Sequence, residues 1–221
     1  YGSGQFLTED YYVANKLLKG ALGSNNFDAN SRLCMSSAVA GYARSLGSDG
    51  PPCCYDDLDS ADLVLLIGTN TAECHPVLFQ RLIKRKRKEK DALRIVVVDP
   101  RATASSEPAD LHLAIRPGTD LVLLHGIGHL LLELQALDQG FIADHTEGFA
   151  ALQALWQQWT PQRVCDLCGI SEVDLRQLAQ WWAEAAGVLS LWSMGVNQSR
   201  EGTATVSGII NLHLATAQIG R

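Results

Sequence analysis

Two short aliphatic runs constrain the fold of this chain more than any other feature of its sequence. Residues 63–67 (Leu-Val-Leu-Leu-Ile) and 94–98 (Arg-Ile-Val-Val-Val) are each followed at once by turn-forming residues. A continuous aliphatic run is typical of a strand buried on both faces, as in parallel sheets. Between the runs, Pro76 opens a segment to residue 88 with apolar side chains at helical spacing. Strand, helix and strand in this order predict a right-handed βαβ unit.

The same alternation continues toward the end of the chain. We expect strands at 111–115 and 188–192, and helices from 121 onward and at 149–159, 171–186 and 206–219. The turn at 116–120 is expected to cap the helix that follows it, and Ser171 is expected to cap the helix at 171–186. Residues 194–198 read as a loop. The predicted fold class is α/β, a doubly wound parallel sheet with helices on both faces.

Composition indicates a soluble globular protein and excludes several partners. Hydrophobic residues make up 47% of the chain and charged residues 19%, with a net charge of −6. This balance predicts no attraction to nucleic acid or to an anionic membrane. The longest apolar run, residues 121–134, contains two histidines and a glutamate, which indicates a buried helix and no membrane span. Because the first residue is Tyr1 and an apolar run precedes the last residues, we expect a piece of a larger protein.

Polar, glycine-containing turns follow the predicted strands at 68–75, 99–103 and 194–198, and the turn at 116–120 lies nearby in sequence. Ligands of open α/β sheets bind beyond the carboxyl ends of the strands, so these turns should converge on one crevice. The Gly-x-Gly-x-x-Gly fingerprint is missing from the sequence. The pattern by itself therefore predicts a nucleotide-like cofactor and leaves the chemistry open.

Several of these segments resemble a known family, in order and at compatible spacing. Residues 30–39 (Asn-Ser-Arg-Leu-Cys-Met-Ser-Ser-Ala-Val) resemble the metal-ligand segment of molybdopterin oxidoreductases, in particular their nitrate reductase branch. Residues 67–76, 98–101 and 116–120 resemble that family's first, second and third cofactor-binding turns. Residues 193–198 resemble the segment that returns to the cofactor, and residues 1–5 a further family segment.

The resemblance implies the fold of formate dehydrogenase and DMSO reductase and a bis-(molybdopterin guanine dinucleotide) molybdenum cofactor. Cys34 would supply the metal-binding thiolate, with Met35 beside it as a second catalytic residue. The residues implied to bind the cofactor are Gln5, Asn30, Cys34, Ile67, Gly68, Thr69, Asn70, Glu73, Cys74, His75, Val98, Asp99, Pro100, Arg101, Gly118, Thr119, Asp120, Met194 and Gln198. Which of Asp99 and Asp120 contacts guanine stays open, as does whether His75 reaches the cofactor or caps the helix at Pro76.

The implied activity is the reduction of nitrate to nitrite in nitrate assimilation, in the cytoplasm, with ferredoxin or an NADH-linked flavoprotein subunit as electron donor. A [4Fe–4S] cluster is expected in the full-length protein but is not ligated by these residues, so the chain alone is expected to be inactive. Two alternatives share the fold. One is a formate dehydrogenase, in which a histidine usually follows the metal ligand where this chain has Met35. The other is a metal-free electron-transfer or scaffold subunit.

Other candidate sites have simpler interpretations. Cys165 and Cys168 form a lone Cys-x-x-Cys, which offers two ligands where structural zinc needs four. His125 and His129 lie at i, i+4, but Gly126 replaces the glutamate of a zinc-protease motif, so helix packing is favoured. We expect residues 55–185 to form one contiguous cofactor-binding domain, and residues 1–54 and 186–221 to be parts of a second, incomplete α/β domain.

Overall fold

A four-stranded parallel sheet organises the chain in the computed structural model, which describes residues 1–4, 6–89 and 92–219. The strands are β1 (Leu63–Ile67), β2 (Arg94–Val98), β3 (Leu111–Leu113) and β4 (Val188–Trp192), in the order β3-β2-β1-β4. In the central pairs Leu63 lies opposite Arg94 of β2 and Val188 of β4. The predicted βαβ unit and the parallel sheet are confirmed.

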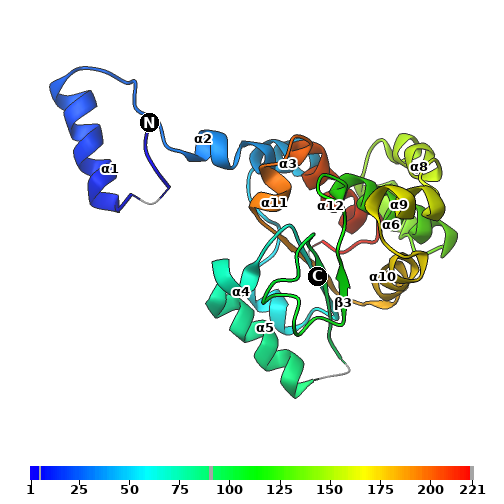
Figure 1. Ribbon diagram of the computed structural model, residues 1–221. Coiled ribbons are helices and arrows are strands. Elements are labelled where there is room, and N and C mark those ends of the chain that lie inside the picture. The colour runs from blue at the N-terminus through cyan, green and yellow to red at the C-terminus, as the bar shows by residue number, and fades with distance from the viewer. Residues whose placement is uncertain (5, 90–91, 220–221) are drawn as a thin grey trace.

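Helices connect and cover these strands (Figure 1). They are α1 (Thr8–Asn15), a π-helical turn (Lys16–Ala21), α2 (Ser31–Cys34), α3 (Ser36–Leu46), a 3₁₀ turn (Tyr55–Asp59), α4 (Thr71–Cys74), α5 (Pro76–Lys88), α6 (Asp120–Glu133), α7 (Gln139–His145), α8 (Phe149–Gln157), α9 (Pro161–Cys168), α10 (Glu172–Glu184), α11 (Met194–Asn197) and α12 (Gly202–Ala215). Among the described residues, none of these helices is long and apolar enough to span a bilayer.

Alternate side chains of the strands enter two separate cores. Leu63, Leu65 and Ile67 of β1 pack in one core with residues of α6, α8, α9, α10 and α12. Val64 and Leu66 point to the other face and pack with residues of α5 and the 3₁₀ turn. Both faces are therefore covered, which is the physical reason that the strands read as continuous aliphatic runs.

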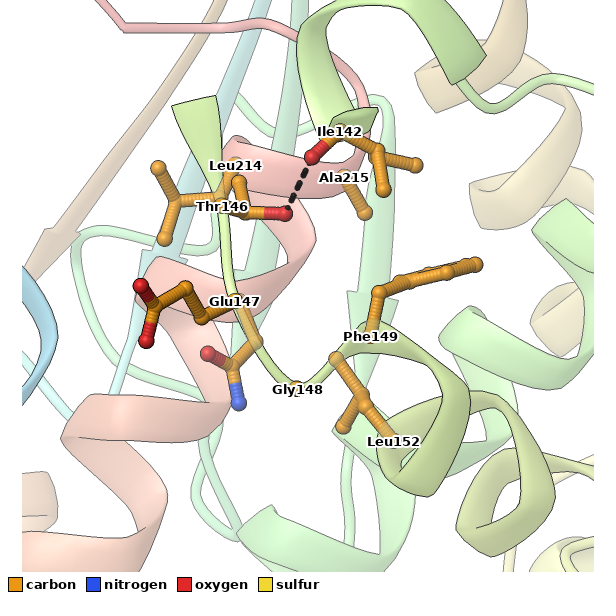
Figure 2. A pocket seen from close by; sticks show the side chains of 9 residues that line it. Ile142, Thr146, Glu147, Gly148, Phe149, Leu152, Leu214 and Ala215 are labelled. Carbon is orange, nitrogen blue, oxygen red and sulfur yellow. Dashed lines mark hydrogen bonds between the residues drawn. The ribbon is translucent and has the colours of Figure 1, made fainter. Parts of the chain in front are cut away.

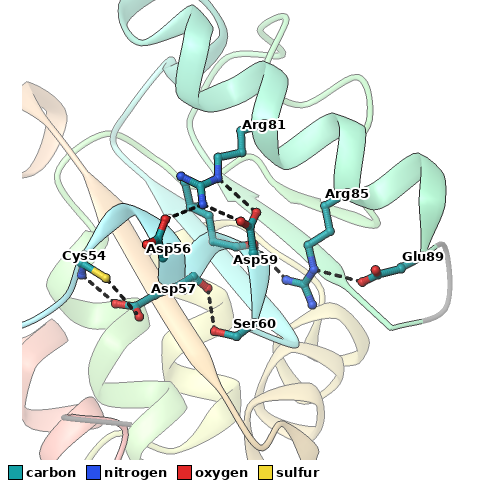
Figure 3. Close-up of polar contacts among 9 residues, drawn as sticks. Cys54, Asp56, Asp57, Asp59, Ser60, Arg81, Arg85 and Glu89 are labelled. Atoms are coloured by element: carbon teal, nitrogen blue, oxygen red, sulfur yellow. Dashed lines mark hydrogen bonds and ion pairs between the residues drawn. The ribbon is translucent and has the colours of Figure 1, made fainter.

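Ion pairs fasten α5 to the 3₁₀ turn, as Figure 3 shows. Arg81 pairs with Asp56 at 2.7 Å and also with Asp59, and Arg85 donates to the main-chain oxygen of Leu58 at 3.0 Å. Lys86 pairs with Asp110 at 2.7 Å. Arg85 and Lys86 of the basic run at residues 84–88 thus attach α5 to its neighbours.

Most predicted elements have the bounds that the structure shows or lie within a few residues of them, and the differences have local causes. The helix predicted at 206–219 is α12, which starts and ends four residues earlier. It ends because the Thr216 hydroxyl donates to the Leu212 carbonyl and Ala217 adopts a left-handed φ of 52°. The loop predicted at 194–198 contains the helical turn α11, and the strand predicted at 111–115 stops at Leu113.

The positions of α1 and β4 can be compared with the expected division into two domains. None of the residues of α1 is buried, and Figure 1 shows α1 apart from the sheet. By contrast β4, which lies beyond the expected boundary at residue 185, pairs with β1 in the same sheet. The sheet thus includes residues from both sides of that boundary, and the division itself stays a prediction.

Gly128 provides a test of the core around α6. A Cβ atom there would overlap the indole ring of Trp156, which is 1% exposed. We expect Gly128→Ala to lower the free energy of unfolding by about 1–3 kcal/mol through overpacking, measured by equilibrium urea unfolding. Gly140→Ala in α7 is the matched control, because its Cβ would meet only the Asp138 carboxylate at 3.5 Å. Equal stability of the two variants would contradict the packing that we describe.

Candidate functional site

Cys34 lies where the segment after β4 meets α2. Its side chain is half-buried, and the Gln198 side-chain amide donates to its sulfur at 3.2 Å. The Asn197 side-chain amide donates to the Cys34 main-chain oxygen at 2.7 Å. Met35, the next residue, is 44% exposed. The structure thus brings the predicted metal-ligand segment and the predicted returning segment together, although more than 160 residues separate them in sequence.

Two glycines allow the first turn and the returning turn to touch. Gly68 follows β1 with a φ of 59°, and its main-chain oxygen accepts from Gly195 N at 3.0 Å. A Cβ on Gly68 would lie 2.8 Å from the Val196 nitrogen, so only glycine fits this close approach. The carboxyl ends of β1 and β4 therefore share one edge, as the parallel pairing requires.

A buried polar network shapes the first turn and ties it to the second. The Thr69 and Thr71 hydroxyls lie 3.2 Å apart, and both residues are 4% exposed. The Ser105 hydroxyl donates to Asn70 Oδ1 at 2.9 Å and accepts from Ala72 N at the same distance. Ser105 is fully buried and was not among the predicted residues. The only sequence signal for it is its place in a short polar run after the second turn.

Two carboxyl groups lie close together at the second and third turns. Asp99 is 8% exposed and accepts from Arg101 N at 2.8 Å. Burial raises the pKa of Asp120, its own backbone N–H lowers that pKa by a smaller effect, and the charge of Asp99 raises it further. Nearby, the Thr103 hydroxyl is buried without a hydrogen-bond partner among the described residues. These turns thus contribute two carboxyl groups at the edge of the sheet.

The remaining residues that were predicted to bind the cofactor differ in their exposure to solvent. Ile67 and Val98 are buried in the core, so a ligand can reach only their main-chain atoms. The exposed members are Glu73, Cys74, His75, Pro100, Arg101, Gly118, Met194 and Gln198, while Asn30 and Thr119 are half-buried. His75 is the N-cap residue of α5 through its main-chain oxygen, which accepts from Phe79 N at 3.0 Å, and its side chain makes no capping bond. Gln5 lies outside the described residues.

The cysteines and histidines that the sequence analysis rejected as metal sites make ordinary structural contacts. Cys165 and Cys168 are buried on α9, and burial raises the pKa of both thiols, which disfavours the thiolate. The His125 ring stacks on Trp159 with centroids 5.5 Å apart, and burial lowers its pKa. His129 bonds to the Trp156 main-chain oxygen at 3.0 Å.

Two cavities lie away from the predicted turns. Figure 2 shows a small pocket of about 140 Å³ between α7, α8 and α12, lined by Ile142, Phe149 and Leu152 among others. A larger apolar cavity of about 930 Å³ runs along β4. Of the predicted site residues only Met35 lines the larger cavity, and none lines the small pocket. Neither of these two cavities is thus formed by the predicted turns.

Comparison with known families decides the classification. The profile described as molybdopterin oxidoreductase matches residues 1–221. The chain belongs to the molybdopterin oxidoreductase family. Among curated relatives it is 56% identical to the nitrate reductase of Synechocystis sp. over 221 residues, which is all of this chain and 31% of that protein. It is 43% identical to the periplasmic nitrate reductase of Desulfovibrio desulfuricans over 230 residues, covering all of this chain and 30% of that protein.

Members of the family with other names are also similar. Formate dehydrogenase H of Escherichia coli is 33% identical over 213 residues, covering 96% of this chain and 29% of that protein. In each case the chain spans about a third of the relative's length. Among solved structures, acetylene hydratase from Pelobacter acetylenicus superposes with a TM-score of 0.77 at 20% identity, covering 95% of this chain and 28% of that chain. The fold predicted from the resemblance is confirmed.

The raised pKa of Asp120 makes the stability of the folded chain depend on pH. A carboxyl group whose pKa is raised on folding destabilises the folded state when charged, so this cost is present at neutral pH and disappears in acid. We expect Asp120→Asn to raise the urea midpoint at about pH 7 and to leave it unchanged near pH 3. The exposed Asp144→Asn in α7 serves as control. A gain of equal size at both pH values would contradict this origin.

Proposed function

We propose that this chain is the cofactor-binding part of a molybdenum-dependent nitrate reductase, which reduces nitrate to nitrite. The observation that carries the proposal is the half-buried Cys34 thiol, contacted by Gln198 at the shared carboxyl edge of β1 and β4. Support for the substrate comes from the names of the relatives, of which the Synechocystis and Desulfovibrio proteins are nitrate reductases.

The residues at this edge suit a bis-(molybdopterin guanine dinucleotide) molybdenum cofactor. Thiolate sulfur is a soft ligand for such a metal, and Cys34 is reachable because it is only partly buried. The close approach of Gly68 to Gly195 leaves no room for side chains and holds the turns after β1 and β4 side by side through a main-chain hydrogen bond, so a ligand at this edge would meet both turns. When bound, the cofactor supplies oxygen-atom transfer chemistry and this chain supplies its placement.

We assign the individual contacts by position. Cys34 holds the metal, and Met35 lies beside the reacting centre. One of the carboxyl groups of Asp99 and Asp120, which lie at the second and third turns, would accept from a donor of guanine or ribose. The other contacts come from Gln5, Asn30, Ile67, Gly68, Thr69, Asn70, Glu73, Cys74, His75, Val98, Pro100, Arg101, Gly118, Thr119, Met194 and Gln198.

Met35 favours nitrate over formate as substrate. Oxidation of formate needs a group that takes up a proton, and a thioether does not titrate. The Met35 sulfur lies 3.6 Å from the Asn197 amide, an arrangement that holds the thioether beside Cys34. Formate dehydrogenase remains the second candidate because a relative of that name is 33% identical.

The wider setting of the enzyme is a further part of the proposal. We propose an assimilatory, cytoplasmic enzyme, because the chain is 56% identical to the Synechocystis protein and 43% identical to the periplasmic one. In the full-length protein, ferredoxin or an NADH-linked flavoprotein subunit would deliver electrons through a [4Fe–4S] cluster held outside these residues. The chain alone, at about a third of its relatives' length, would then be inactive.

Replacing Cys34 tests the proposal in the full-length protein. Cys34→Ser should reduce nitrate-dependent oxidation of a reduced viologen dye by at least about a hundredfold, because a serine oxygen does not replace the soft thiolate ligand of the metal. Elemental analysis for molybdenum reports the cofactor separately. Cys53→Ser serves as the matched control for thiol loss, because Cys53 is an exposed cysteine to which no contact with the cofactor is assigned.

Three results would contradict parts of the proposal. Wild-type protein that contains no molybdenum would support a scaffold subunit. Wild-type protein that oxidises formate and leaves nitrate unchanged would support a formate dehydrogenase. Full nitrate reduction by Cys34→Ser would rule out the ligand role of Cys34.

A further inference from the structure

Asn197 is a buried amide that bridges two consecutive residues of a distant segment. It is 4% exposed, whereas Met194 at the other end of α11 is 51% exposed. Its Nδ2 donates to the Cys34 main-chain oxygen at 2.7 Å and lies 3.6 Å from the Met35 sulfur, within range of a weak N–H···S bond. One side chain thus contacts both residues that the proposed function places at the metal.

The main chain of Asn197 is attached to the sheet. Its N–H donates to the Ser193 carbonyl at 3.2 Å, and the Ser193 hydroxyl donates to the Gly68 oxygen at 3.3 Å. Gly68 directly follows β1, and β4, which leads into α11, is paired with β1 along all five of its residues. The position of the Asn197 amide is therefore set by the parallel sheet.

Cys34, by contrast, has little support from its own helix. α2 is only four residues long, and the neighbours Leu33 and Met35 are 69% and 44% exposed. A short helix with exposed side chains has few apolar contacts to fix its position. The amide of Asn197 supplies a contact to the main chain from the rigid edge of the sheet, while Gln198 contacts the sulfur itself. Figure 1 shows α11 beside α3, the helix that follows Met35.

We propose that Asn197 is a positioning residue, which holds the Cys34 main chain and Met35 at the carboxyl edge of β4 and so sets the place of the metal-binding sulfur. This inference rests on the proposed function, because it takes Cys34 to be a metal ligand. It predicts that removing the amide loosens Cys34 even when no cofactor is bound.

Two neutral substitutions in the full-length protein separate the amide from general packing. Asn197→Leu keeps a similar volume without the donor, and Asn197→Ala removes the side chain. Thr216→Val is the matched control. It removes a buried hydroxyl that is also held by two hydrogen bonds, to Trp182 at 3.1 Å and to Leu212 at 2.8 Å, at the opposite end of α12.

The first measurement is alkylation of Cys34 by iodoacetamide in metal-free protein, followed by mass spectrometry. Loss of a hydrogen bond to a partly buried group corresponds to about a tenfold change in the population of loosened states. We therefore expect Cys34 to react about tenfold faster in both Asn197 variants and at the wild-type rate in Thr216→Val. The exposed Cys74 provides an internal standard in every sample. An unchanged rate in Asn197→Leu, or an equal increase in Thr216→Val, would overturn the role of Asn197.

The second measurement is X-ray absorption at molybdenum in the purified holoenzymes. The sulfur contribution from Cys34 should weaken or broaden in both Asn197 variants and stay unchanged in Thr216→Val. Cys34→Ser gives the reference for complete loss. A Cys34→Ser enzyme with the wild-type sulfur signal would overturn the proposed function. A signal that is lost in Cys34→Ser but intact in Asn197→Leu, with unchanged alkylation, would overturn only the inference about Asn197.

Discussion

The parallel pairing of β1 with β4 is the interaction on which the site depends. The register runs from Leu63 opposite Val188 to Ile67 opposite Trp192, so both strands end at the same level. Because they run in one direction, the residues that follow them must lie side by side, and Gly68 touches Gly195. Shifting β4 by one residue would turn its buried side chains to the other face and would also separate these turns. The free energy that fixes the site therefore comes largely from burial of aliphatic side chains.

Polar residues at the turns fall into two groups with different roles. Thr69, Thr71 and Ser105 are buried and bonded to one another or to the main chain, so they determine the shape of the turns. Glu73, His75 and Arg101 are exposed and are free to meet a ligand. Unsatisfied buried polar groups are costly, and the Thr103 hydroxyl, which has no hydrogen-bond partner among the described residues, adds such a cost to the second turn. A cofactor that covers this edge would meet a surface already held in shape.

The elements that sequence reasoning placed well are those with a local signal. The bounds of β1, β2, β4 and α5 match the predictions, since a continuous aliphatic run or a proline at the first helical turn does not depend on distant residues. The helices α7 and α9 were missed although both carry start signals. The Asp138 side chain caps α7 by accepting from Phe141 N, and Pro161 opens α9. These helices have only seven and eight residues, which is too few to show the repeat of apolar residues that is typical of a helix.

The site was predictable in its parts and unpredictable in its connections. The candidate segments were found because each carries an unusual local sequence, and the structure brings Cys34 and the returning segment together as expected. Nothing near Asn197 or Ser105 in the sequence indicates their partners, because Asn197 meets Cys34 across 163 residues and Ser105 meets Asn70 across 35. Contacts of this kind exist only once the sheet has formed.

A metal-binding cysteine faces two opposing requirements. It must be held in place, yet it must remain open to an incoming cofactor, so it cannot be fixed by burial in a core. Here Cys34 is half-buried on a four-residue helix, and the groups that contact it come from the end of a strand in the sheet. Directional hydrogen bonds from the side chains of α11 can fix the main chain without covering the sulfur. A short α2 that is held by Asn197 of α11 meets both requirements, whereas a longer and better packed helix would meet only the first.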